Sequence, residues 1–309
     1  MVTGAGSGVG KHLVKVLSGK GHKVLATDVN EVALNRALEE EEATEKWDKT
    51  NVHVLKLDVT VEADWRNAME FCEKNFGGLD VCMNLAGYLK PGKTQNLTKK
   101  DIDNHVDVNL KGVMLGTTFA AWLMSKQVAE GKLDSGGHII NFASLGAIAP
   151  VSGVTLYIGT KYGCRGFSLC ASKDLFDHGV FVTCVLPDAI QTPMVDLQLN
   201  YEDSALAFSG SVLSLHDVEN VMFTRILPYR EREVLIASSF LRGKAARLAD
   251  LCSGSVALNW IEKHMRRLGV QRQQMKKQIL KAEDQKKKKE TLIEETYDRS
   301  QSPVLFRET

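Results

Sequence analysis

The chain has 309 residues, of which 44% are hydrophobic and 25% charged, and its formal net charge at pH 7 is +1. This length and composition allow a large buried core, in one sizeable domain or two small ones. The near-neutral charge gives no whole-chain signature of a nucleic-acid-binding or membrane-binding protein, so any such partner has to be argued from a local segment.

A glycine-rich run lies at the start of the chain and precedes apolar residues at helical spacing. The run comprises Thr3, Gly4, Ala5, Gly6, Ser7, Gly8, Val9 and Gly10. Glycines let the backbone turn tightly and approach a pyrophosphate, while the N-terminus of the following helix offers free N–H groups. The run therefore predicts a phosphate cradle.

A strand expected at residues 22–27 leads into Asp28, near the position where an acidic residue binds the ribose hydroxyls of a dinucleotide. The carboxylate would repel a 2′-phosphate, and no Lys or Arg lies within the glycine run to attract one. The sequence therefore favours NAD over NADP as the cofactor.

Beyond Asp28, short strands alternate with helices. Helices are expected at residues 30–47, 61–76, 99–129 and 153–178, and strands at 52–59, 79–83, 138–143 and 180–186. This alternation is typical of βαβ units and predicts an α/β fold, a doubly wound parallel sheet with helices on both faces. Such sheets bind ligands at the carboxyl ends of their strands, so polar residues there should share one crevice. These strand-end residues are Asp28, Asp58, Asn84, Ser144 and Pro187.

Tyr157 precedes Lys161 by four residues, so on a helix the two side chains share one face. An ammonium held close to a phenol favours the phenolate, which lets the tyrosine exchange a proton near neutral pH. Ser144 would orient a substrate oxygen by hydrogen bonding. The three residues together predict an acid/base site.

As an ordered set, these residues resemble the short-chain dehydrogenase/reductase family over about residues 1–237. The resemblance implies a Rossmann fold that binds NAD(P) and an active site with a Tyr-x-x-x-Lys motif. The residues that carry it are Thr3, Gly4, Gly8, Gly10, Asp58, Val59, Asn84, Ala86, Gly87, Asn109, Ser144, Tyr157, Lys161 and Pro187.

The resemblance also implies a role for each site residue. Tyr157 is the expected general acid/base, Lys161 favours its phenolate and binds the nicotinamide ribose, and Ser144 polarises the substrate oxygen. Asn109 is expected to hold a water in the proton relay. The implied cofactor site consists of Thr3, Gly4, Ser7, Gly8, Val9, Gly10, Asp28, Asp58, Val59, Asn84, Ala86, Gly87, Tyr157, Lys161, Pro187, Ile190 and Thr192.

The function implied is an NAD-dependent oxidoreductase that interconverts a secondary alcohol and a ketone. The partners implied are a small-molecule substrate and a second copy of the chain, in a homodimer or homotetramer formed through residues 99–129 and 153–178. No nucleic-acid partner is expected. A dinucleotide-binding scaffold with little or no catalysis is the alternative from another class, and a sugar-nucleotide epimerase is a weaker enzyme alternative.

Two features depart from the family pattern. The family usually has Pro-Gly after the sixth strand, whereas this chain has Pro187-Asp188. Because Asp tolerates positive φ better than most residues, we interpret this as a variation. Only Met1 and Val2 precede Thr3, where a longer central strand is usual, so we expect the natural chain to begin earlier.

Residues 191–210 correspond to the mobile substrate lid of the family, and their apolar side chains suit a lipophilic substrate of steroid, retinoid or long-chain acyl type. The apolar residues are Met194, Val195, Leu197, Leu199, Leu206 and Phe208. Packing of the lid onto the domain is the alternative explanation of the same residues.

The C-terminal region is expected to leave the catalytic domain after residue 240. Before that point, a helix at residues 214–227 has Ser214 as N-cap and Asp217 near its third position, and a strand at 233–237 closes the sheet. Residues 241–268 form a basic amphipathic helical extension that packs on the domain or a sister subunit, with peripheral membrane contact as the alternative. Residues 269–309 are expected to be a charged, flexible tail.

The six cysteines are scattered, with no Cys-x-x-Cys pair and no His/Cys ligand spacing. We therefore expect free thiols in a cytoplasmic or other reducing intracellular compartment, with no bound metal, no signal peptide and no membrane-spanning helix. The thiols expected to be buried among apolar residues are Cys72, Cys82, Cys170 and Cys184.

Overall fold

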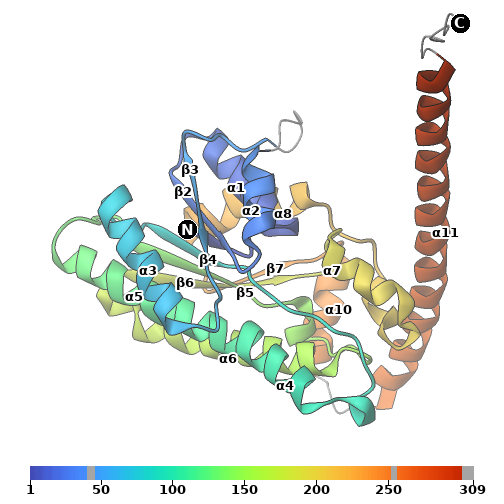
Figure 1. Cartoon of the computed structure of the whole chain (residues 1–309). Helices are drawn as coiled ribbons and strands as arrows, with labels where there is room; N and C mark the ends of the chain where they lie inside the picture. The colour runs from blue at the N-terminus through green and yellow to red at the C-terminus, as the bar shows by residue number, and fades with distance from the viewer. Residues whose placement is uncertain (40–45, 252–255, 301–309) are drawn as a thin grey trace, which may run out of the picture.

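A parallel sheet organises the molecule. The computed structural model describes residues 1–39, 46–251 and 256–300. Its seven-stranded sheet has the order β3-β2-β1-β4-β5-β6-β7, every neighbouring pair is parallel, and helices cover both faces (Figure 1). The predicted doubly wound α/β fold is confirmed. The strands are β1 (Val2–Thr3), β2 (Val24–Asp28), β3 (Val52–Lys56), β4 (Val81–Asn84), β5 (Gly137–Phe142), β6 (Val180–Pro187) and β7 (Glu233–Ile236).

Two layers of helices cover the sheet. One layer consists of α1 (Gly8–Gly19), α2 (Glu31–Glu39), α8 (Leu215–Val221) and α9 (Leu227–Tyr229), and the other of α3 (Glu62–Phe71), α4 (Lys99–Val106), α5 (Gly112–Ala129) and α6 (Thr155–Asp174). Strands covered on both faces are apolar throughout, as in β2, where Val24, Leu25 and Ala26 are each at most 2% exposed. The core therefore lies on both sides of the sheet and leaves its edges and strand ends for ligands.

The shortest strand, β1, occupies the middle of the sheet. Its Val2 is aligned with Ala26 of β2 and with Met83 of β4, and it is buried. The amino group of Met1 donates a hydrogen bond to the carbonyl oxygen of Val81 at 2.9 Å. The glycine run follows directly, so it begins at the carboxyl ends of the neighbouring strands.

The predicted helix at residues 30–47 is too long at its C-terminal end. Helix α2 ends at Glu39, residues 40–45 lie outside the described part of the chain, and Trp47 is not helical. Trp47 is fully buried, and its indole N–H donates to the carbonyl oxygen of Lys11 in α1 at 3.0 Å. Packing against α1, rather than a local helical pattern, determines the position of Trp47.

The predicted continuous helix at residues 99–129 is divided in the structure. A π-helical turn, Asp107–Lys111, separates α4 from α5. Such turns widen the helix locally and are frequent at functional sites. The turn contains Asn109, which is completely buried.

The helix cap predicted at Ser214 is confirmed. The hydroxyl of Ser214 accepts from the backbone N–H of Asp217, and the Asp217 carboxylate accepts from the backbone N–H of Ser214 at 2.7 Å. This reciprocal capping satisfies donors at the start of α8, which then packs on α1.

One of the cysteine predictions is wrong. Cys72, Cys82 and Cys184 are buried free thiols as predicted, but Cys170 is exposed and Cys164 is buried in its place. Both belong to α6, and a separation of six residues turns the side chain by about 120° around the helix axis, so Cys164 is buried while Cys170 is exposed. Cys252 lies outside the described residues.

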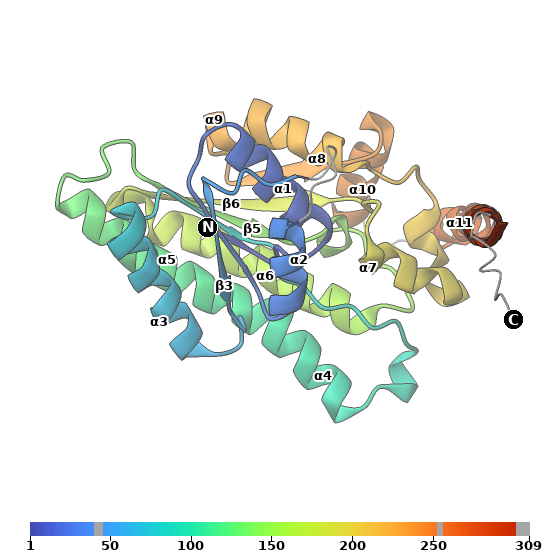
Figure 2. The same cartoon turned by 45° about the horizontal axis from the view of Figure 1, so that its top comes forward.

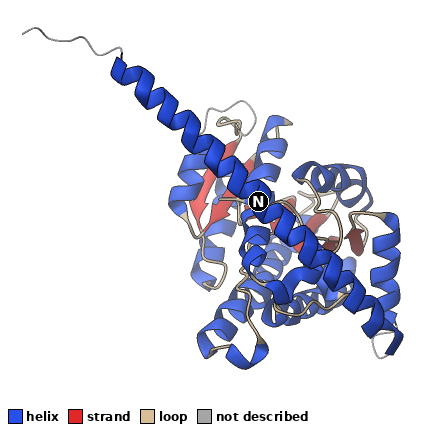
Figure 3. Cartoon of the chain, turned by 90° about the vertical axis from the view of Figure 1, so that its right-hand side faces the viewer, coloured by secondary structure: helices blue, strands red, loops and turns tan. Residues whose placement is uncertain are grey.

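The C-terminal region forms two helices, α10 (Phe240–Leu251) and α11 (Val256–Ser300). Ala246 of α10 is buried in a cluster with Leu186 and Leu235 at the end of the sheet. Helix α11 passes along one side of the molecule and then extends beyond it (Figures 1 and 3). The boundary expected at residue 268 therefore falls inside α11. In the described part of the chain, no helix combines the length and apolar character needed to cross a membrane.

Candidate functional site

A cavity of about 1510 Å³ opens at the carboxyl ends of the strands. It exceeds the usual size of a pocket for one small molecule, so it has room for a dinucleotide and a substrate together. The predicted site residues that line it are Gly4, Ser7, Gly8, Val9, Gly10, Asp28, Asp58, Val59, Ala86, Gly87, Ser144, Tyr157, Lys161, Pro187, Ile190 and Thr192. One crevice therefore brings together most of the residues singled out in the sequence.

The glycine run fits a pyrophosphate because side chains are excluded from it. Gly4 has φ +67°, and a Cβ there would lie 2.9 Å from the backbone of Ala86. A Cβ on Gly10 would lie 2.2 Å from the carbonyl oxygen of Gly4. Helix α1 begins at Gly8 and has no acidic residue in its first turn, so its N–H groups and positive dipole end can receive an anion.

Two carboxylates line the end of the cavity next to β2 and β3. Asp28 accepts hydrogen bonds from the backbone N–H groups of Gly6 at 3.0 Å and Asn30 at 2.9 Å. Asp58 accepts from the backbone N–H of Thr60 at 2.9 Å. These bonds hold both carboxylates in place. Among the described residues that line this end, from Gly4 to Gly10 and from Asp28 to Thr60, none is Lys or Arg.

Thr3 and Asn84 do not line the cavity, and they support it from behind. The Thr3 hydroxyl accepts from the backbone N–H groups of Leu85 at 3.0 Å and Ala86 at 3.1 Å. The Asn84 amide donates to the side-chain oxygen of Asn141 at 2.8 Å, inside the sheet. Both residues therefore position the loop after β4, which carries Ala86 and Gly87.

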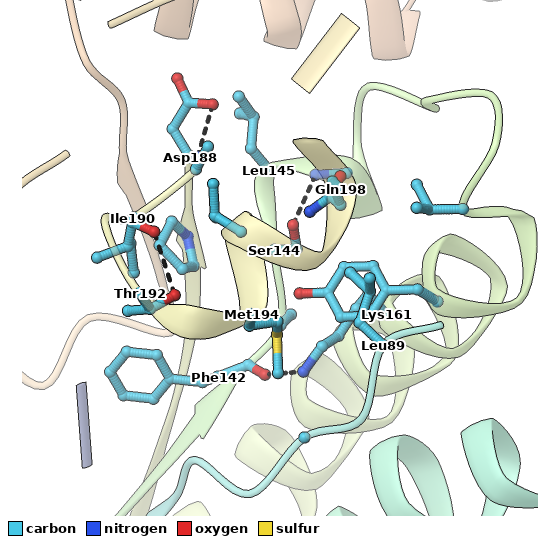
Figure 4. Close-up of a pocket in the computed structure, with 18 of the residues that line it drawn as sticks. Leu89, Phe142, Ser144, Leu145, Lys161, Asp188, Ile190, Thr192, Met194 and Gln198 are labelled. Carbon is cyan, nitrogen blue, oxygen red and sulfur yellow. Dashed lines mark hydrogen bonds between the residues drawn. The ribbon is translucent and has the colours of Figure 1, made fainter. Parts of the chain in front are cut away.

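Lys161 and Tyr157 of α6 meet at the end of β5. Lys161 is 4% exposed, and its Nζ donates to the carbonyl oxygen of Phe142 at 2.6 Å (Figure 4). The same Nζ lies 5.5 Å from the centre of the Tyr157 ring. Burial raises the pKa of the Cys164 thiol, one turn further along α6, although Lys161 lies nearby. The cation is thus fixed beside the phenol, and the thiol stays protonated.

Ser144 follows β5 and lines the same cavity as Lys161 (Figure 4). Its hydroxyl accepts a hydrogen bond from the backbone N–H of Gly146 at 3.1 Å. A hydroxyl that accepts in this way keeps its own proton available for a substrate oxygen.

Asn109 does not line the cavity in this structure. Its side-chain oxygen accepts from the backbone N–H of Tyr88 at 2.7 Å, and its amide donates to the Tyr88 carbonyl at 2.8 Å and the Thr160 hydroxyl at 3.2 Å. Thr160 in turn donates to the backbone carbonyl of Tyr157 at 2.8 Å. Asn109 therefore joins the loop after β4 to the helix that carries Tyr157.

The segment after β6 has Asp188 where the family usually has glycine. Asp188 has a negative φ. Among the described residues, Arg230 is the one non-glycine with positive φ. The Asp188 carboxylate is buried and pairs with Arg242 of α10, and Nη2 donates to Oδ1 at 3.0 Å. Sequence analysis missed this pair, although an acidic residue in place of a glycine was a signal.

The predicted lid is a series of short helices, α7 (Pro193–Asp196), η6 (Leu197–Asn200) and η7 (Glu202–Phe208). Val195, Leu199 and Phe208 are buried against one another. Leu197 is 55% exposed, and the side chain of Leu206 is outside the described part. Much of the apolar character of the lid therefore serves its own packing. The lid residues that line the cavity are Thr192, Pro193, Met194, Val195, Gln198, Ser209 and Gly210.

The C-terminal helices also contribute to the cavity, which sequence analysis did not predict. Leu241, Arg242, Ala245 and Ala246 of α10, and Met265 and Arg272 of α11, belong to its lining. The apolar remainder of the substrate end comes from Leu89, Leu145, Val151, Val154 and Ile158. The described residues contain no group of three or more His, Cys, Asp or Glu side chains arranged to hold a metal ion.

Comparison with known proteins agrees with this geometry. A family model described as short chain dehydrogenase matches residues 1–202. A mitochondrial borneol dehydrogenase of Lavandula x intermedia is 33% identical over 221 residues, which cover 71% of this chain and 79% of the relative. An uncharacterized oxidoreductase of Staphylococcus aureus (strain N315) is 30% identical over 192 residues, which cover 62% of this chain and 78% of the relative.

Two solved structures share the fold. The crystal structure of levodione reductase has a TM-score of 0.65 at 23% identity, and the match covers 76% of this chain and 94% of that one. A structure described as ElxO with NADP bound has a TM-score of 0.65 at 21% identity, and the match covers 77% of this chain and 96% of that one. In both cases the match covers nearly all of the known protein and about three quarters of this chain.

Proposed function

The chain belongs to the short-chain dehydrogenase family, and from this premise we propose that it interconverts a secondary alcohol and a ketone on a lipophilic small molecule, with NAD as cofactor. The observation that carries the proposal is the meeting of Ser144, Tyr157 and Lys161 in the cavity that the glycine run also lines. The chain is an NAD(P)-dependent oxidoreductase of this family; the substrate class and the choice of NAD are the proposal.

In this proposal the residues of the chain divide the chemistry among them. When bound, the nicotinamide supplies hydride exchange with the substrate carbon. Tyr157 exchanges the proton of the substrate oxygen, and Ser144 donates a hydrogen bond to that oxygen. Lys161 uses one N–H for the Phe142 carbonyl, which leaves its other donors for the nicotinamide ribose and its charge beside the phenol. Asn109 would hold the water of the proton relay by fixing the loop at Tyr88, to whose backbone it is hydrogen-bonded.

The preference for NAD rests on the charges near the adenosine ribose. Asp28 presents a carboxylate where a 2′-phosphate would lie, and no described lining residue at that end is basic to compensate. The bound NADP in the ElxO structure is a property of that protein, and this chain resembles it in fold.

A lipophilic substrate is supported by the side chains around the catalytic tyrosine. Leu89, Val154 and Ile158 form a buried cluster against which Tyr157 and Met194 pack. A borneol dehydrogenase among the relatives acts on a compact apolar alcohol by its name. The presence of Ser144, Tyr157 and Lys161 together in the cavity supports an enzyme over a dinucleotide-binding scaffold.

We also propose the assembly and the domain division that the family implies. Exposed apolar side chains on α5 and α6, Trp122 at 60% and Tyr162 at 37%, support contact with a second copy. Residues 1–240 would form the catalytic domain with residues 191–210 as its lid, and a reducing intracellular compartment suits the free thiols.

The test is a screen of secondary alcohols and ketones, including hydroxysteroids, retinols and long-chain hydroxyacyl compounds, followed by the absorbance of NADH. We expect Tyr157→Phe to lower kcat by about a thousandfold or more and to leave the Kd for NADH nearly unchanged, because one hydroxyl needed for proton transfer is lost. Tyr229→Phe, which makes the same change at a position that is 72% exposed, is the control. Wild-type kcat in Tyr157→Phe would show that Tyr157 is not the acid/base.

A further inference from the structure

One face of α11 lies along the lid. Arg266, Gly269, Gln273 and Lys276 follow one another at intervals of three, four and three residues, which places them on one side of a helix. Gly269 is buried, which allows the helix to approach closely. Helix α11 lies next to the lid at the edge of the molecule (Figure 2). We propose that this face of α11 is the positioning element of the substrate lid and sets the shape of the substrate end of the cavity.

Gln273 is the centre of the contact. It is 3% exposed, and its Nε2 donates to the carbonyl oxygens of Gln198 at 2.6 Å and Tyr201 at 3.0 Å. Gln198 lies in η6 and Tyr201 directly follows it. Each carbonyl also accepts a backbone hydrogen bond, Gln198 from the N–H of Tyr201 at 3.0 Å and Tyr201 from the N–H of Ser204 at 3.1 Å. The Gln273 amide therefore adds a bond from α11 to each carbonyl. Its removal would break the two buried hydrogen bonds that join this turn to α11 and so favour movement of the lid.

Basic side chains of α11 also contact the lid on both sides of Gln273. Arg266 pairs with Asp203 at 2.8 Å, and Lys276 pairs with Asp196 at 2.9 Å. Arg272 donates to the backbone carbonyl of Ser209 at 2.7 Å. The contacts thus reach the beginning, middle and end of the lid. Single ion pairs near the surface are screened by water, so the buried Gln273 is the dominant contact and the pairs add orientation.

The lid residues held in this way also line the cavity. Met194 and Gln198 face the substrate end, and Gln198 is the residue whose carbonyl Gln273 binds. Movement of η6 would therefore change the volume available to the substrate, while the glycine run and Asp28 lie at the other end. This consequence for substrate binding rests on the proposed function, whereas the lid contact itself does not.

The sequence provides matched controls for the test. Arg266, Gln273 and Lys276 are each followed by a residue of the same type, Arg267, Gln274 and Lys277. Within the described residues, the side chains of these three followers make no hydrogen bond or ion pair. Each pair of variants therefore changes the same chemistry on the same helix and differs only in contact with the lid.

The experiment compares Gln273→Ala with Gln274→Ala in the full chain. We expect Gln273→Ala to exchange the amide hydrogens of residues 197–208 faster in deuterium oxide, and to raise KM for the substrate identified in the screen by about tenfold. The Kd for NADH, measured by titration, should stay at the wild-type value in both variants. Equal exchange rates in the two variants would overturn the proposal.

A second pair of variants keeps the test decisive if Gln273→Ala does not fold. Lys276→Glu should increase exchange in the lid relative to Lys277→Glu, and Lys276→Asp combined with Asp196→Lys should restore the slower exchange. If the variant with the two charges swapped still shows fast amide exchange, the ion pair between Lys276 and Asp196 does not position the lid. If no substrate is found, the exchange measurement still decides on the lid contact, so failure of the proposed function is separate from failure of this inference.

Discussion

At the scale of single residues, Asp28 has two tasks. Its carboxylate lines the cavity where the adenosine ribose would bind, and it also holds the backbone N–H of Gly6 within the glycine run. Replacement by Ala would remove both functions. Replacement by Asn removes the charge and keeps an oxygen that can accept from Gly6, so it separates electrostatic discrimination from loop support.

We therefore expect Asp28→Asn to narrow the preference for NAD over NADP by about tenfold, because a carboxylate near a 2′-phosphate repels it and accepts stronger hydrogen bonds from ribose hydroxyls. Isothermal titration with both cofactors measures the ratio. Asp80→Asn, at an exposed position, controls for the change in net charge. Tighter binding of NADP than of NAD to the unmutated protein would contradict the assignment.

The lowered pKa of His138 makes the free energy of unfolding depend on pH. Its ring in β5 is hydrogen-bonded to the Thr183 hydroxyl at 2.8 Å, and burial, together with Arg230, lowers its pKa from 6.5 to about 3. The unfolded chain therefore binds a proton that the folded chain does not. Stability from this residue is fully present above pH 6.5 and is lost as the pH falls towards 3.

The double variant His138→Val with Thr183→Val removes both hydrogen-bond partners and places β-branched side chains, which suit strands, at both positions. Between pH 6 and pH 4, the free energy of unfolding should fall less in the variant than in the wild type, by about 1.4 kcal/mol per pH unit. Urea unfolding at a series of pH values measures the two slopes. Parallel slopes would mean that His138 does not control this range.

At the scale of elements, α10 is attached to the ends of the strands by ion pairs. Arg242 binds Asp188 after β6, and Arg247 binds Glu233 of β7 at 2.6 Å. Burial opposes ionisation of Glu233, but hydrogen bonds from Arg165 and Arg247 hold its pKa below the usual value. A helix outside the family match thus determines the conformation of the segment that leads to Ile190 and Thr192.

Arg242→Met should lower the free energy of unfolding by about 3 kcal/mol, because it leaves the Asp188 carboxylate buried without its partner. Adding Asp188→Asn to that variant should recover most of the loss, since the buried charge is then removed. Urea unfolding of the wild type, both single variants and the double variant completes the cycle. A strictly additive double variant would show that the two side chains are not coupled.

At the scale of the whole molecule, the C-terminal helices contribute to the cavity and to the contacts of the lid. Helix α10 lines the cavity and α11 contacts the lid, although the family match ends at residue 202. Of the basic residues in the segment expected to be amphipathic, Arg242, Arg247 and Arg266 are engaged in ion pairs with the domain. Packing on the domain is thereby favoured over membrane contact for this segment.

Truncation distinguishes these possibilities. A chain ending at Ala237 should have a lower Tm and little activity, because it loses the cavity wall and exposes the apolar end of the sheet. A chain ending at Lys281 keeps every described contact of α11 with the lid and should retain the wild-type Tm and KM. Binding of both truncated chains and of the full chain to anionic vesicles is measured by sedimentation at low and high salt. Salt-sensitive binding that requires residues 241–268 would favour the membrane alternative.

Much of the fold and the candidate site could be predicted from the sequence, because the signals are local. The glycine run and the helical spacing of Tyr157 and Lys161 depend on residues close together in the chain. The alternation of strands and helices then determined that their polar ends meet at one edge of a parallel sheet. The sequence by itself therefore determined the architecture and the family, and most of the site residues that it predicted line the cavity.

Contacts between distant segments were decided only by the tertiary structure. Arg242 lies 54 residues after Asp188, and Gln273 lies 75 residues after Gln198. The burial of Cys164 instead of Cys170, the packing of Trp47 on α1 and the turn at Asn109 also depend on neighbours from other elements. The physical reason is that burial and hydrogen bonding depend on which surfaces meet after folding, and a local sequence pattern does not specify its distant partners.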